Sequence, residues 1–184
     1  MRLSYRPHKL LRHPDTPSGA IWRGEAGYER GAGGAIVVRY ALIGDVGALL
    51  LPAPSAPSRA DDLWKHTCFE AFVWPSRDKH YYEFNFSPST EWAAYRFDDY
   101  RSGMRHADAT APAIEQSSAG ERFELTARFV VPEGGDGVWR LGLTAVVEES
   151  SGEKSYWALG HPPGAPDFHN RGASVFAFFD LGTT

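Results

Sequence analysis

Hydrophobic and polar residues alternate along most of the chain, and this alternation is typical of half-buried β-strands. The alternating runs are short and are separated by turn-forming Gly, Pro, Asn, Asp and Ser residues. Turns are expected at 31–34, 75–79, 87–90, 132–137 and 150–152. The predicted strands are 20–28, 35–43, 67–74, 81–87, 92–98, 111–116, 122–131, 138–149, 154–159 and 174–181.

Only one short helix is predicted, at 58–64, where Ser58 could cap a turn. About ten strands joined by hairpin-length turns favour an all-β fold, an antiparallel β-sandwich. A length of 184 residues favours a single domain spanning 1–184. The loop at 160–172 is longer than the other connections, and loops of that length are often functional.

Three central predicted strands allow a register argument. Alternation gives each an apolar triplet: Phe69, Ala71 and Val73 in the first, Tyr82, Phe84 and Phe86 in the second, and Ala93, Tyr95 and Phe97 in the third. A slip of one residue would expose a whole apolar set, so the triplets are expected to share one buried face. Symmetrical hairpins then pair Glu70 with Asn85, Glu83 with Arg96, and Asn85 with Ala94.

This register predicts a polar outer face. The residues expected there are Glu70, Glu83, Asn85, Trp92 and Arg96. Carboxylate, amide and guanidinium groups match the vicinal hydroxyls of a sugar, and an indole ring can stack on a pyranose. A small saccharide is therefore the expected partner. The hypothesis requires Glu70 and Arg96 to lie on the same side of the sheet, and opposite sides would refute it. The alternative is a solvated face with a Glu83–Arg96 ion pair and tryptophans in the core.

Two segments carry a resemblance to known proteins. LWKHTCFEAFV at 63–73 and YYEFNFSP at 81–88 resemble family 9 carbohydrate-binding modules and the bacterial DOMON-like proteins grouped with them. YWALGHPPGAPDFH at 156–169 resembles the DOMON-like proteins in particular.

The resemblance implies a β-sandwich of jelly-roll type that binds sugar without catalysis. In sugar-binding relatives two Trp residues clamp a terminal sugar, and an acidic residue, an Arg and amides hold its hydroxyls. Trp64 matches one clamp residue and Glu70 the acidic residue. Arg96 is placed by strand order, and Trp157 is the nearest match for the second clamp. We further expect Trp157, His161 and His169 to form the wall opposite Trp64.

Composition excludes several other classes of protein. A net charge of −4 argues against a nucleic-acid partner that depends on neutralising phosphates. The most apolar stretch, 40–53, is interrupted by Gly44, Asp45, Gly47 and Pro52, so no membrane span is expected. Cys68 is the only cysteine, which rules out an internal disulfide and a cysteine-based zinc site. With no export signal recognised, a cytoplasmic protein is expected.

Four alternatives stay open at this stage. His161, Asp167 and His169 could bind a metal, although their spacing matches no standard motif and the prolines between them could simply stiffen the loop. Some DOMON relatives bind haem through Met and His, which would require Met104 with His80, His161 or His169, and some sugar-binding relatives bind calcium. Despite these possibilities, we expect the protein to have no cofactor.

The remaining two alternatives are an enzyme and a protein-interaction module. A glycosidase would need two carboxyl groups, for which Glu70 and Glu83 are the candidates. Pairing with Arg96 is expected to lower the pKa of Glu83 and make it a poor acid. A protein-interaction module could instead use exposed strand edges and the aromatic patch.

Overall fold

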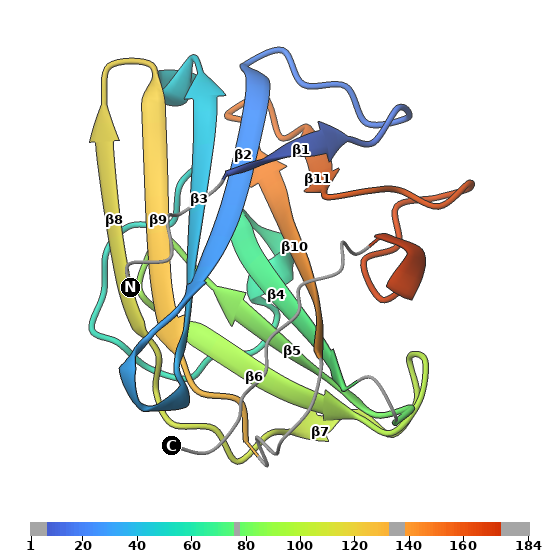
Figure 1. Ribbon diagram of the computed structural model, residues 1–184. Helices are drawn as coiled ribbons and strands as arrows, with labels where there is room; N and C mark the ends of the chain where they lie inside the picture. The colour runs from blue at the N-terminus through green and yellow to red at the C-terminus, as the bar shows by residue number, and fades with distance from the viewer. Residues whose placement is uncertain (1–6, 76–77, 133–138, 174–184) are drawn as a thin grey trace.

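The computed structural model describes residues 7–75, 78–132 and 139–173 (Figure 1). Within these ranges the chain forms antiparallel strands and short 3-10 turns. No described helix has the length and apolarity needed to cross a membrane. The strands are β1 His8–Arg12, β2 Ile21–Arg30, β3 Ile36–Gly44, β4 Cys68–Pro75, β5 Tyr81–Phe86, β6 Trp92–Phe97, β7 Arg105–His106, β8 Ala113–Ala119, β9 Arg122–Phe129, β10 Trp139–Glu148 and β11 Lys154–Ala158.

All these strands join one sheet in the order β7-β6-β5-β4-β10-β11-β1-β2-β3-β9-β8. β1 is the seam between two halves of this sheet. Its first part pairs with β2, as in Leu10 opposite Gly24, and its end pairs with β11, as in Arg12 opposite Trp157. The sheet curls at this seam, so the half formed by β2, β3, β9 and β8 faces the half formed by β11, β10, β4, β5, β6 and β7 (Figure 1). The all-β sandwich predicted from the sequence is confirmed.

The main hydrophobic core fills the space between the two halves. Tyr40 of β3 packs on Phe69 of β4 with ring centroids 5.1 Å apart, and Phe129 of β9 packs on Phe84 of β5 at 4.4 Å. The buried Tyr40 hydroxyl donates a hydrogen bond of 2.7 Å to the Glu70 backbone carbonyl. The apolar triplets predicted for β4 and β5 therefore face inward, as expected.

Nine of the ten predicted strands are present with boundaries shifted by a few residues, and the tenth, 174–181, lies outside the described residues. The helix predicted at 58–64 is wrong. Arg59 instead forms a parallel bridge to Trp92, and the only helical turn nearby is Leu63–Lys65. β1 and β7 were not predicted, because each is short and lacks a clear alternation of apolar and polar residues.

The predicted register of β6 is also wrong, by one residue. Glu83 pairs with Tyr95 rather than with Arg96. The cause is the turn between β5 and β6, where the Ser87 N–H bonds to the Glu91 carbonyl at 3.0 Å. Three residues lie inside this pair, and Thr90 takes a left-handed conformation with φ of 76°. Hairpins with three-residue loops characteristically contain such a residue, and the odd loop length shifts the pairing.

The slip exchanges the two faces of β6. Trp92 and Ala94 now join the core between the halves, and Arg96 follows them on that side because strand residues alternate. Ala93, Tyr95 and Phe97 point the other way. They join a second apolar cluster on the side of β4, β5, β10 and β11 that faces away from the core, which we call the outer face.

Candidate functional site

A cavity of about 840 Å³ lies on the outer face. Its floor comes from β4, β5, β6, β10 and β11, and its walls come from the segments before β4, between β6 and β7, and after β11. The lining residues are Asp61, Asp62, Trp64, Glu70, Phe72, Glu83, Tyr95, Phe97, Arg101, Met104, Arg105, His106, Val146, Tyr156, Pro166, Phe168 and His169.

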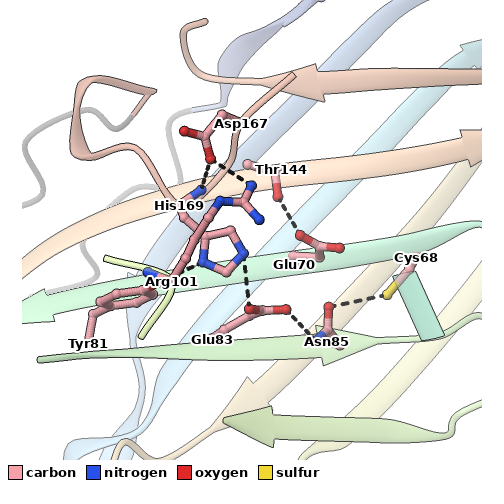
Figure 2. Close-up of polar contacts among 9 residues, drawn as sticks. All are labelled: Cys68, Glu70, Tyr81, Glu83, Asn85, Arg101, Thr144, Asp167 and His169. Atoms are coloured by element: carbon pink, nitrogen blue, oxygen red, sulfur yellow. Dashed lines mark hydrogen bonds and ion pairs between the residues drawn. The ribbon is translucent and has the colours of Figure 1, made fainter. Parts of the chain in front are cut away.

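Two buried carboxyl groups lie at the floor of this cavity (Figure 2). Glu70 of β4 is 3% exposed and Glu83 of β5 is 6% exposed. The Thr144 hydroxyl donates to Glu70 Oε2 at 3.3 Å, and Asn85 Nδ2 donates to Glu83 Oε1 at 2.8 Å. Behind Asn85, the Cys68 thiol donates to its side-chain oxygen at 3.7 Å.

Burial changes the protonation of these groups. It raises the pKa of Glu70 well above its ordinary value, and the nearby charge of Glu83 raises it further, while the Thr144 hydrogen bond acts in the opposite direction. Burial also raises the pKa of Glu83 to about 7, against the opposing effects of the Asn85 hydrogen bond and the Arg101 charge. The pair can therefore hold a proton near neutral pH.

His169 lies over Glu83. Its Nδ1 is 2.7 Å from the Tyr81 hydroxyl, and its Nε2 is 3.7 Å from Glu83 Oε2. Burial and the nearby Arg101 charge lower the pKa of His169 to about 4. His169 is consequently neutral at pH 7, and its approach to Glu83 is a contact between a ring and a carboxyl group rather than an ion pair.

An ion pair holds the last wall in place. Arg101 Nη2 donates to Asp167 Oδ1 at 2.8 Å, and the Tyr100 hydroxyl donates to Asp167 Oδ2 at 2.7 Å. Asp167 also accepts a bond of 3.2 Å from the His169 backbone N–H. These bonds fasten the loop after β11 to the segment between β6 and β7, so the long loop predicted at 160–172 does form part of the cavity.

The upper walls are largely aromatic. Trp64 is 46% exposed and belongs to the turn before β4, while Phe72, Phe97 and Phe168 lie deeper. The Tyr95 hydroxyl donates a hydrogen bond of 2.6 Å to an Asp61 carboxylate oxygen, which fixes the ring at one side. The cavity thus combines flat apolar surfaces with a few fixed polar groups.

Several of the residues predicted from the sequence meet at this place. Trp64, Glu70, Glu83 and His169 line the cavity. Asn85 lies opposite Glu70 on the same face, as predicted, but it is fully buried and bonds to Glu83 rather than lining the cavity.

Arg96 and Trp92 do not belong to this site. Because of the register slip, both lie on the side of β6 opposite to Glu70. Arg96 donates to Asp98 at 2.7 Å, and Trp92 stacks under the Arg59 guanidinium at 4.3 Å. The requirement that Glu70 and Arg96 share one side of the sheet fails, so the saccharide hypothesis in the form derived from the register is refuted. A ligand can be proposed only from the cavity that the structure shows.

Trp157 and His161 also lie elsewhere. Trp157 is 3% exposed in the core between the halves, where its Nε1 donates to Ser155 at 2.9 Å. Tyr156, its neighbour, points to the outer face instead and lines the cavity. His161 packs on β1, with Nε2 2.8 Å from the Leu11 carbonyl, and its pKa is lowered mainly by burial. These two residues therefore do not form a wall with His169.

The three residues considered as metal ligands diverge. His161 contacts Leu11, Asp167 bonds to Arg101, and His169 contacts Tyr81. Among the residues that the structure describes, no group of three or more His, Cys, Asp or Glu side chains could hold a metal ion.

Met104, considered as a haem ligand, lines the same cavity as His169. His169 does not aim a nitrogen at it, because its two nitrogens face Tyr81 and Glu83.

Arg101 and Tyr95 are the main residues of the cavity that were not predicted from the sequence. Tyr95 was placed in the core by the wrong register. Arg101 lies in a polar stretch with no recognisable pattern, and only the tertiary contact with Asp167 reveals its position. Asp167 and Phe168 belong to the segment that carried the DOMON-like resemblance, but nothing in that segment indicated their contacts.

Comparisons with known proteins bear on the fold. No protein-family model matches the sequence, and no curated protein matches it. A solved structure from Bacteroides uniformis ATCC 8492, described as a "putative carbohydrate-binding protein", superposes with a TM-score of 0.68. It is 16% identical, and the match covers 93% of this chain and 84% of that one.

A family 9 carbohydrate-binding module from Caldicellulosiruptor kristjanssonii, solved with cellotriose, superposes with a TM-score of 0.52. It is 9% identical, and the match covers 87% of this chain and 75% of the module. At these identities the likeness concerns the fold. The eleven described strands therefore form an all-β sandwich of the kind found in family 9 carbohydrate-binding modules.

Proposed function

We propose that the outer-face cavity binds a saccharide or a sugar-like small ligand without changing it chemically. The observation that carries the proposal is Glu70, a carboxyl group at the floor of the cavity with one oxygen bonded to Thr144 and the other without a partner in the described structure. A carboxyl oxygen that is free at the floor of a cavity can accept a hydrogen bond from a ligand hydroxyl that reaches it.

The size and lining of the cavity support this proposal. A volume of about 840 Å³ lies within the range of small-molecule sites, which is roughly 300–1,000 Å³. The exposed Trp64 ring offers a flat apolar surface for the C–H face of a pyranose, while the floor offers acceptors for its hydroxyls. One protein of the same fold was solved with cellotriose bound, which makes saccharides the first ligands to test.

Calorimetric titration with a panel of mono- and oligosaccharides tests the proposal. Trp64→Ala should weaken binding by about 1–3 kcal/mol, because it removes the exposed stacking surface. Trp22→Ala is the matched control, since Trp22 is 60% exposed on β2 in the other half of the sheet. The proposal fails if no saccharide binds, or if both variants weaken binding equally.

Glycoside hydrolysis is a second candidate function. Pairing with Arg96 was expected to lower the pKa of Glu83, but burial raises this pKa to about 7, which suits a general acid. Glu70 shares the same cavity and could act as the second carboxyl group. Incubating the wild type and Glu70→Gln with chromogenic glycosides separates the two functions. Turnover by the wild type that Glu70→Gln abolishes would establish hydrolysis, and absence of turnover would leave binding alone.

A further inference from the structure

Building on the proposed function, we propose that the cavity is specific for a sugar that carries a protonated amine, a hexosamine rather than a neutral hexose. The amine would lie at the floor between Glu70 and Glu83, and the sugar ring would lie against the aromatic walls.

The cationic side chains around the cavity are engaged by carboxylates other than the floor pair. Arg101 bonds to Asp167 at 2.8 Å, and the rim cations are paired in the same way. These rim pairs are Arg105 with Asp98 at 2.9 Å and Lys65 with Asp62 at 2.7 Å. His106 Nε2 also lies 2.8 Å from Asp61 Oδ1. His169, the nearest basic group to the floor, is neutral at pH 7. Among the described residues, Glu70 and Glu83 are thus left without a hydrogen-bonded cation.

Each floor carboxyl group also keeps one oxygen for a ligand. Thr144 occupies only Oε2 of Glu70, and Asn85 occupies only Oε1 of Glu83. Glu83 Oε2 is 3.7 Å from His169 Nε2, which is too long for a hydrogen bond. The two side chains are on neighbouring strands, Glu70 opposite Asn85 and Glu83 opposite Phe72, so they are diagonal neighbours on one face.

A protonated amine fits this pair better than a hydroxyl does. An ammonium group has three N–H donors and a positive charge, whereas a hydroxyl has one donor and no charge. Hydrogen bonds between charged partners are shorter and stronger than neutral ones, particularly where water is excluded. Phe72 and Tyr95 also line the cavity, and aromatic rings attract a cation placed over their faces.

Binding of such a cation should release protons. A positive charge beside the pair favours the ionised carboxylates and so lowers their pKa, which burial now holds high. The other titratable and charged groups around the pair are Cys68 of β4, Tyr81 of β5, Tyr95 of β6, Tyr156 of β11, and Arg101, Asp167 and His169 of the loops. None of these supplies a free cation, so the ligand amine would be the new positive charge at the floor.

The test compares matched sugars by calorimetry at pH 7: glucosamine with glucose, galactosamine with galactose, and mannosamine with mannose, each also as the N-acetyl derivative. At least one amine should bind tenfold or more tightly than its neutral parent and its N-acetyl form. This preference should fall below threefold in Glu83→Gln. Glu115→Gln, which removes an exposed carboxylate from β8, should keep the full preference.

A second readout needs no variant of the floor. Titrating the wild type with the preferred amine in buffers of different ionisation enthalpy should show proton release, while the neutral parent should show none. Equal binding of amine and neutral parent, or a preference that survives in Glu83→Gln, would overturn the amine inference and leave the proposed function standing. If no sugar of the panel binds, the proposed function itself fails.

Discussion

Replacing Glu83 by glutamine should stabilise the unliganded protein above neutral pH. The glutamine side chain keeps an oxygen that can accept the Asn85 hydrogen bond, but it never acquires a charge. In the wild type, the folded protein must either hold a proton on Glu83 or bury a carboxylate that is 6% exposed. The difference in the free energy of unfolding between the wild type and Glu83→Gln should therefore depend strongly on pH.

The size of the effect follows from the pKa of Glu83, which burial raises from 4.5 to about 7. Between these values the folded protein holds a proton that the unfolded chain has released, so the free energy of unfolding falls as the pH rises. The full shift corresponds to about 3 kcal/mol, of which about 2–3 kcal/mol is lost between pH 5 and pH 8. His169 contributes with the opposite sign, because its pKa is lowered to about 4, so its stabilisation grows as the pH rises toward its unfolded value.

Because Glu70 and His169 also contribute to the pH dependence of the wild type, the comparison of variants is more informative than the wild type alone. Urea unfolding followed by tryptophan fluorescence at pH 5, 6, 7 and 8 gives the free energy of unfolding for the wild type, Glu83→Gln and Glu115→Gln. The stability of Glu83→Gln relative to the wild type should rise by about 2–3 kcal/mol across this range, and that of Glu115→Gln should not change. Parallel curves for Glu83→Gln and the wild type would refute the assignment of a raised pKa to Glu83.

Three further predictions follow from contacts outside the floor. Tyr40→Phe should lower the free energy of unfolding by about 1–2 kcal/mol, because it removes a buried hydrogen bond between the two halves; an unchanged urea midpoint would contradict this. Arg101→Ala should raise the rate of amide hydrogen exchange at 159–170 by about fivefold, because it removes an ion pair worth about 1 kcal/mol. The exchange rate in β9 should stay constant. The Cys68 thiol, whose pKa is raised mainly by burial, should react with a thiol reagent only after unfolding, and rapid labelling of the native protein would contradict its position.

The strands were predictable because alternation and turn residues are local signals. The register of β4 and β5 also followed from alternation, since Glu70, Glu83 and Asn85 mark the outer face clearly. β6 gave no such signal, because apart from Arg96 its residues are apolar on both faces. Where both faces of a strand are covered, the pattern specifies the register weakly, and one left-handed residue, Thr90, decides it.

The site was predictable only in part for the same reason. Trp64, Glu70 and Glu83 were found because a motif or a polar position on an apolar strand identified them. Trp157 and Tyr156 are adjacent aromatic residues, and no local rule decides which of them faces the core. The contact between Arg101 and Asp167 joins segments 66 residues apart in sequence, so it depends on the finished fold.

The place of β1 in the sheet has a consequence for synthesis of the protein. β1 lies between β2 and β11 in the sheet, although β1 is the first and β11 the last described strand to be synthesised. The hydrogen bonds between β1 and β11 therefore cannot form until β11 has left the ribosome. Until Trp157 and Ala158 have emerged, one edge of β1 remains unpaired and open to pairing with other chains. The two halves of the sandwich can join along β1 only after β11 has been translated. The nascent chain is therefore more exposed to aggregation than the finished protein is.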